Sequence, residues 1–102
     1  MGKKSAIDSL SRIISNIAIH EILVRYTNKP ESINYLNSEI LEYRDVAFST
    51  ASKFNWNKED LNHIKSKSLD LLKKEMPKRY PDVKYPEKEV EKIIGEIIKN
   101  TL

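Results

Sequence analysis

The stretch INYLNSEILEYRDVAFSTASKF, residues 33–54, carries the clearest structural pattern in the sequence. Its apolar residues recur every three or four positions, the spacing at which side chains share one face of an α-helix. The members of this stripe are Ile33, Leu36, Ile40, Tyr43, Ala47, Ala51 and Phe54. Pro30 precedes the stretch and suits the first turn of a helix, because that turn does not need its missing N–H donor. We therefore predict a helix over residues 31–54 that buries one face.

The residues before this helix carry a second and broader apolar face. They predict a helix over residues 5–26, with Ser5 as the N-cap and Asp8 completing part of a capping box. Its apolar residues are Ile7, Leu10, Ile13, Ile14, Ile17, Ala18, Ile22 and Val24. Because this apolar arc is wide, we expect the helix to lie at the centre of the fold. The β-branched and aromatic residues of EILVRY, residues 21–26, leave a short strand open as an alternative.

A third helix is predicted after a polar and aromatic turn. Asn57 is a good N-cap, and Glu59 and Asp60 suit the positive end of the helix dipole. We predict that this helix covers residues 58–76 and that Pro77 ends it. Its apolar side contains Leu61, Ile64, Ser68, Leu71, Leu72 and Met76.

A fourth helix is predicted over residues 86–100, with Pro86 in its first turn. Its apolar residues form a narrow stripe of Val90, Ile93, Ile94, Ile97 and Ile98. This stripe can pack on its own domain or pair with a second copy of the chain. Three prolines in and next to residues 77–85 predict that this connection is extended, near polyproline II, and on the surface.

The 102 residues suffice for one domain, residues 1–102, with one modest core. Two glycines leave little room for the tight turns of a many-stranded sheet. We therefore predict an all-α fold, either a four-helix bundle or two packed helical hairpins. Residues 9–15 resemble residues 60–66 at an offset of 51, which makes a degenerate internal duplication one interpretation. A groove between two such hairpins is the natural place for a partner.

The composition excludes several classes of protein. The absence of cysteine excludes disulfides, thiol nucleophiles and thiolate metal sites. The apolar fraction of 39% and the charged fraction of 32% are typical of a folded domain with a highly charged surface. The longest apolar-rich stretch, residues 13–26, is interrupted by charged and polar residues, and no signal-peptide core precedes it. We therefore expect a cytoplasmic protein without a membrane partner.

The sequence shows no motif of an enzyme. His20 and His63 are the two histidines, and neither lies in an HxxxH, HExxH or ExxH pattern. We expect His20 to be packed beside the apolar arc and His63 to face solvent. Phosphate-binding glycine loops and a GxSxG elbow are also missing. We therefore predict a protein that is not an enzyme, with no catalytic residue, no metal and no cofactor.

Aromatic residues outside the apolar stripes favour a non-catalytic protein–protein interaction module. Tyr35 and Phe48 lie off the stripe of residues 33–54, and aromatic and arginine residues are enriched at binding hot spots. The residues predicted to bind a partner protein or peptide are Trp56, Arg79, Tyr80 and Tyr85. Packing of Trp56 over one end of the core is the alternative for that residue. The partner can also be a second copy of the chain.

Nucleic-acid binding is the alternative function. The whole net charge of +3 comes from the second half of the chain, where bases can contact phosphates and tyrosines can stack on unpaired bases. The residues predicted for this function are Lys73, Lys74, Lys78, Arg79, Tyr80 and Lys84. Acidic residues are interspersed, and the bases do not share one helical face, so the pattern is not that of a helix-turn-helix protein.

Overall fold

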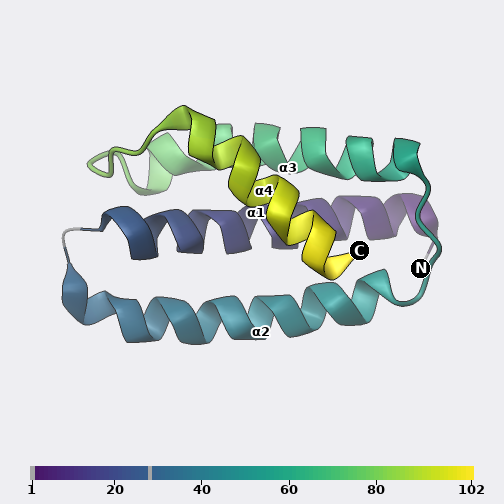
Figure 1. The fold of residues 1–102 in the computed structure, drawn as a ribbon, viewed down its shortest axis with the longest axis horizontal. Helices are drawn as coiled ribbons and strands as arrows, with labels where there is room; N and C mark the ends of the chain where they lie inside the picture. The colour runs from purple at the N-terminus through teal and green to yellow at the C-terminus, as the bar shows by residue number, and fades with distance from the viewer. Residues whose placement is uncertain (1, 28) are drawn as a thin grey trace.

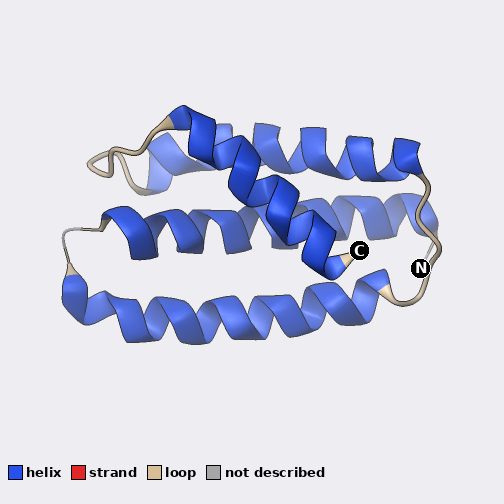
Figure 2. Cartoon of the chain, in the orientation of Figure 1, coloured by secondary structure: helices blue, strands red, loops and turns tan. Residues whose placement is uncertain are grey.

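The computed structural model describes residues 2–27 and 29–102. Over these residues the chain forms helices and turns and no strand (Figure 2). The helices are α1 (Lys3–Tyr26), η1, a short 3-10 helix (Pro30–Ser32), α2 (Ile33–Ala51), α3 (Lys58–Arg79) and α4 (Glu87–Thr101). The predicted all-α fold is therefore confirmed, and residues 21–26, for which a strand was the alternative, are helical.

Helix α1 lies at the centre of the four-helix bundle. Figure 1 shows α2 and α3 on opposite sides of α1, while α4 crosses in front of it at an angle. Two ion pairs, Lys3 with Asp60 and Asp8 with Lys67, connect successive positions of α1 and α3, so these two helices run in parallel. The central position follows from the wide apolar arc, because a helix that is apolar around most of its circumference must be covered on several sides.

Helix α1 begins earlier than the sequence predicts. It starts at Lys3 with Gly2 as the N-cap residue, and Ser5 lies inside the helix. The first turn forms without a side-chain cap, since the Ala6 N–H donates to the Gly2 carbonyl at 3.0 Å and the Lys3 ammonium is held by Asp60 on α3. The predicted break between the first two helices, residues 27–30, includes Asn28, which lies outside the described residues.

Helix α2 ends at Ala51 and does not reach Phe54. After Ala51 the hydrogen bonds are of the 3-10 type, because the Lys53 and Phe54 N–H groups donate to carbonyls three residues earlier in the chain. The start of α2 also differs from the predicted one, since the residues next to Pro30 form the 3-10 helix η1 before the α-helix begins at Ile33.

Helix α3 starts as predicted and ends later. The Asn57 side chain accepts from the Asp60 N–H at 2.8 Å, and the Asp60 carboxylate accepts from the Asn57 N–H at 3.1 Å, which completes a capping box. Pro77 does not end the helix, which continues to Arg79. The exposed proline removes one backbone hydrogen bond near the helix end, and the last bond, from the Tyr80 N–H to the Met76 carbonyl, forms at 2.9 Å.

Residues 77–85, predicted to be extended, begin as the last turn of α3, and the connection proper covers residues 80–86 and starts with a turn. The Val83 N–H donates to the Tyr80 carbonyl at 3.2 Å, and Pro81 occupies the second position of this turn, where its fixed backbone angle fits. Pro86 is the N-cap residue of α4 and does not belong to its first turn.

The apolar stripe of α4 packs on its own domain. Its five apolar residues are all buried in the core. At the start of the helix, Glu89 accepts a hydrogen bond from the Tyr26 hydroxyl at the end of α1. The first of the two predicted uses of the stripe, packing on its own domain, is therefore the one that the structure shows.

Candidate functional site

The candidate site is a hollow of about 410 Å³ where the two halves of the chain meet, called the junction hollow below. The first half contributes residues from the end of α1, from η1 and from the start of α2, and the second half contributes residues 79–83. Leu23, Leu36 and Val83 give it an apolar lining. Polar and charged lining residues are Thr27, Lys29, Ser32, Tyr35, Arg79, Tyr80 and Asp82. The hollow thus combines apolar surface with hydrogen-bonding groups, as ligand and peptide sites do.

Arg79 is one of the charged side chains that line the junction hollow. It is the last residue of α3, where a cation is favoured by the helix dipole. Its guanidinium lies 5.4 Å from the centre of the Tyr80 ring, and its Nη1 is 3.5 Å from Oδ1 of Asn16. No carboxylate among the described residues lies within ion-pair distance of it. An exposed guanidinium held beside an aromatic ring can therefore accept a carboxylate from outside the molecule.

Tyr80 lies next to Arg79, Tyr85 follows in the same connection, and both tyrosines are half-buried against the core. A second, smaller hollow of about 250 Å³ is lined by both tyrosines together with Met76 and Val83. Burial raises the pKa of the Tyr85 hydroxyl above its usual value. Three of the four residues predicted to bind a partner, Arg79, Tyr80 and Tyr85, are thus gathered at one end of the bundle.

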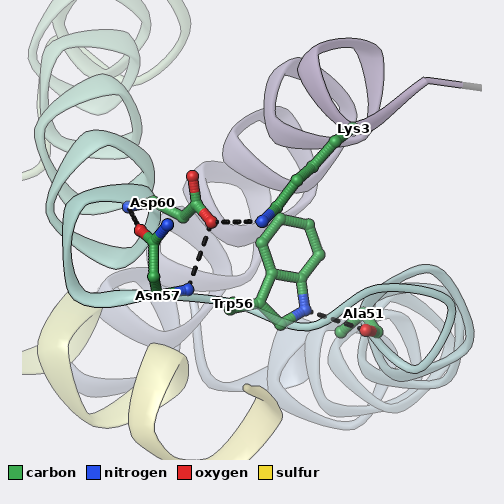
Figure 3. Close-up of polar contacts among 5 residues, drawn as sticks. All are labelled: Lys3, Ala51, Trp56, Asn57 and Asp60. Carbon is green, nitrogen blue, oxygen red and sulfur yellow. Dashed lines mark hydrogen bonds and ion pairs between the residues drawn. The ribbon is translucent and has the colours of Figure 1, made fainter.

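Trp56, the fourth predicted residue, lies near the start of α1 (Figure 3). The junction hollow lies near the other end of that helix, beside Leu23. Its indole N–H donates to the Ala51 carbonyl at 2.8 Å and thereby satisfies a carbonyl at the end of α2. The Lys3 ammonium lies 5.6 Å from the ring and 2.6 Å from the Asp60 carboxylate. These contacts connect the ends of three helices. They account for a structural role of Trp56, and a binding role for this residue stays a prediction.

The same set of contacts determines the charge state of the capping carboxylate. A hydrogen bond from Lys3, followed by the backbone N–H of Asn57, lowers the pKa of Asp60 below its usual value. Asp60 is therefore ionised at neutral pH, as required to accept both hydrogen bonds.

Sequence reasoning missed a polar cluster beside the junction hollow. His20 is 4% exposed, donates from Nδ1 to the Asn16 carbonyl at 2.8 Å, and has Nε2 3.0 Å from Glu39 Oε2. The Tyr43 ring packs edge-on against the imidazole at 5.4 Å between ring centres. Hydrogen bonding by Tyr35, and after it by His20, lowers the pKa of Glu39. Tyr35 also lines the junction hollow, so the cluster and the hollow are continuous.

One signal in the sequence could have indicated this cluster. Tyr35, Glu39 and Tyr43 are spaced four residues apart, so they follow one side of α2 next to its apolar stripe. The predicted burial of His20 and the predicted exposure of His63 are both confirmed. The sequence alone does not show which residue contacts His20.

The bases predicted for nucleic-acid binding are exposed but do not form one surface. Lys74 and Lys78 are four residues apart on α3 and share a side, whereas Lys73 projects about 100° away from Lys74 around the helix. Lys84 lies in the connection before α4. None of these four ammonium groups has an ion-pair partner among the described residues.

Residues 2–27 and 29–102 lack two other features that would indicate a function. These residues contain no group of three or more histidine, aspartate or glutamate side chains arranged to hold a metal ion. No described helix is both long enough and apolar enough to cross a membrane. Comparison of the chain with protein-family models, with curated proteins and with solved structures found no match.

Proposed function

We propose that this protein is a non-catalytic, cytoplasmic interaction module that binds a partner protein through a peptide segment placed in the junction hollow. The observation that supports this function best is the Arg79 guanidinium, which has no carboxylate partner among the described residues and lies beside the Tyr80 ring at the rim of an apolar hollow. Arginine and tyrosine are the residue types that dominate binding energies at protein interfaces.

The arrangement suits a peptide that carries an apolar side chain next to a carboxylate. The apolar side chain would displace water from Leu23, Leu36 and Val83, and the carboxylate would accept hydrogen bonds from Arg79. Because Tyr80 holds the guanidinium near one position, little side-chain entropy is lost when the ion pair forms. The expected ligand is therefore a peptide with an apolar anchor residue and a neighbouring negative charge.

Selection from a displayed library of random peptides tests this proposal. Peptides are selected on the wild-type protein and counter-selected on Arg79→Ala, whose side chain is exposed and can be removed without disturbing the core. We expect the enriched peptides to share an apolar residue beside Asp, Glu or the C-terminal carboxylate. Failure to enrich any peptide that distinguishes the two proteins would contradict the proposal.

Nucleic-acid binding is the second candidate, because Lys73, Lys74, Lys78 and Lys84 are exposed and unpaired among the described residues. Binding of duplex and single-stranded oligonucleotides is measured by fluorescence anisotropy at increasing salt. Nucleic-acid binding through these bases predicts an affinity that falls steeply with salt and that Lys74→Ala and Lys78→Ala weaken for all sequences alike. No binding at low salt would exclude this function.

A further inference from the structure

The junction hollow contains a negative charge as well as positive ones. Asp82 lines it together with Arg79 and Lys29, and all three side chains are exposed. No basic group among the described residues lies within ion-pair distance of the Asp82 carboxylate. Asp82 is therefore not paired with either cation, although it shares the hollow with both, and its charge is available to a group from outside the molecule.

The turn after α3 holds Asp82 close to Arg79. Pro81 precedes Asp82 and has a fixed backbone angle, and the turn is closed by the Val83 N–H, which donates to the Tyr80 carbonyl at 3.2 Å. Val83 also packs against the core. The Cα atoms of Arg79 and Asp82 are three residues apart and thus separated by at most about 11 Å. Two opposite charges are therefore presented close together on an ordered segment.

The apolar lining of the hollow is part of the same arrangement. It consists of Leu23, Leu36 and Val83. An extended peptide rises by about 3.3 Å per residue, so about three of its residues span the largest separation of Arg79 and Asp82. A peptide whose apolar side chain occupies this lining can therefore reach both charges with its neighbouring residues.

We infer that Asp82 selects peptides that carry a lysine or arginine within about three residues of the acidic group that binds Arg79. The peptide and the hollow are those of the function proposed above, on which this inference rests. Complementary charges determine the choice of partner more than the affinity, and a second acidic residue beside Asp82 would be repelled. Asp82 thus excludes uniformly acidic peptides, which Arg79 and Lys29 alone would accept.

The expected size of the effect follows from the exposure of Asp82. Ion pairs between exposed groups change affinities by about twofold to fivefold. Replacement of the peptide's base by an acid removes the attraction and adds a repulsion, so it should weaken binding by about tenfold. Both effects should shrink at high salt, which screens exposed charges.

Charge reversal on both partners tests the inference. A displayed library with one fixed leucine, one fixed glutamate and random remaining positions is selected on the wild-type protein, and we expect the enriched peptides to carry a base. In one such peptide the base is replaced by glutamine and by glutamate. Fluorescence anisotropy at low salt then measures the affinities of the three peptides for wild type and Asp82→Lys. Wild type should bind the base most tightly and the glutamate most weakly, and Asp82→Lys should reverse this order.

Two further variants complete the experiment. Asp70→Lys makes the same change of charge at an exposed position of α3 that does not line the hollow, and it should retain the wild-type order. Asp82→Asn removes the charge without adding one, and its preference for the base should disappear. Circular dichroism checks that each variant is folded, as expected for changes of exposed side chains.

The outcomes separate this inference from the proposed function. Enriched peptides that need Arg79 but carry no base, or the same order of affinities for wild type and Asp82→Lys, would overturn the role of Asp82 and leave the peptide site in place. If no enriched peptide loses affinity in Arg79→Ala, the proposed function fails and the selection by Asp82 fails with it.

Discussion

His20 of α1 and Glu39 of α2 meet at 3.0 Å between Nε2 and Oε2, in a partly buried position beside the junction hollow. This contact joins α1 to α2 and is not part of the apolar core. Tyr35, four residues before Glu39 on α2, lines the hollow. A polar interaction between two helices therefore lies directly beside the candidate site.

The ionised form of Glu39 is expected to stabilise the fold in a pH-dependent manner. The pKa of Glu39 is lower in the folded state than its usual value, so its contribution is present above the unfolded pKa of about 4.3 and is lost as the pH falls through the folded pKa. Glu39→Gln should therefore be less stable than wild type at pH 7, and the difference should shrink below about pH 4. Urea denaturation at several pH values measures this difference.

Glu42→Gln is the matched control for that experiment, because Glu42 is exposed on the same helix. We expect it to change the free energy of unfolding by less than about 0.5 kcal/mol. A stability difference between wild type and Glu39→Gln that is unchanged at pH 3 would show that the carboxylate charge has no part in the effect.

Removal of the N-cap of α3 should destabilise the protein by about 1 kcal/mol. Asn57→Ala loses the acceptor for the Asp60 N–H and leaves this backbone donor without its partner. Thermal and urea unfolding measure the change, with Asn55→Ala, an exposed position outside the helix, as the control. Equal stabilities of the two variants would argue against the capping box as a stabilising contact.

Trp56 is expected to act on stability and not on peptide binding. Trp56→Phe retains an aromatic ring but loses the hydrogen bond to the Ala51 carbonyl, which should cost about 1 kcal/mol of unfolding free energy. Its affinity for peptides selected on the wild-type protein should be unchanged, as measured by fluorescence anisotropy. If affinity fell as far as in Arg79→Ala, Trp56 would belong to the binding site.

Two serines inside the core are expected to be unfavourable for stability. Ser11 and Ser68 are fully buried, and neither hydroxyl has a hydrogen-bond partner in the structure. Ser68→Ala removes such a hydroxyl and also raises helix propensity, so it should stabilise the protein. Ser66→Ala, on the exposed side of α3, is the control, because it raises helix propensity without removing a buried hydroxyl. We expect the free energy of unfolding of Ser68→Ala, measured by urea denaturation, to exceed that of this control by about 1 kcal/mol. A Ser68→Ala protein that is less stable than wild type would contradict this expectation.

The helices were predictable because their apolar residues repeat at a helical period, and each such face had to be buried. Helix ends were less predictable, since they depend on contacts from distant parts of the chain. Lys3 is held by Asp60, so α1 starts before Ser5, and the Ala51 carbonyl is used by Trp56 where α2 ends. Pro77 is tolerated because it lies on the exposed side of the last turns.

The candidate site was predictable in part. Arg79, Tyr80 and Tyr85 are close in sequence, so their proximity in the structure follows from a short turn. The contact between His20 and Glu39 joins two helices, and its prediction requires the rotation of α2 relative to α1, which apolar spacing alone defines too coarsely. The hollow itself requires the packing of both halves of the chain.

The measurement that tests the central proposal most directly is the affinity of one selected peptide for wild type, Arg79→Ala and Lys84→Ala at the same salt concentration. Lys84 is an exposed base in the same connection and does not line the junction hollow. Loss of a hydrogen-bonded ion pair to Arg79 should weaken binding by about tenfold or more, while Lys84→Ala should bind like wild type. Equal affinities for wild type and Arg79→Ala, or an equal loss in both variants, would contradict a peptide site built around Arg79.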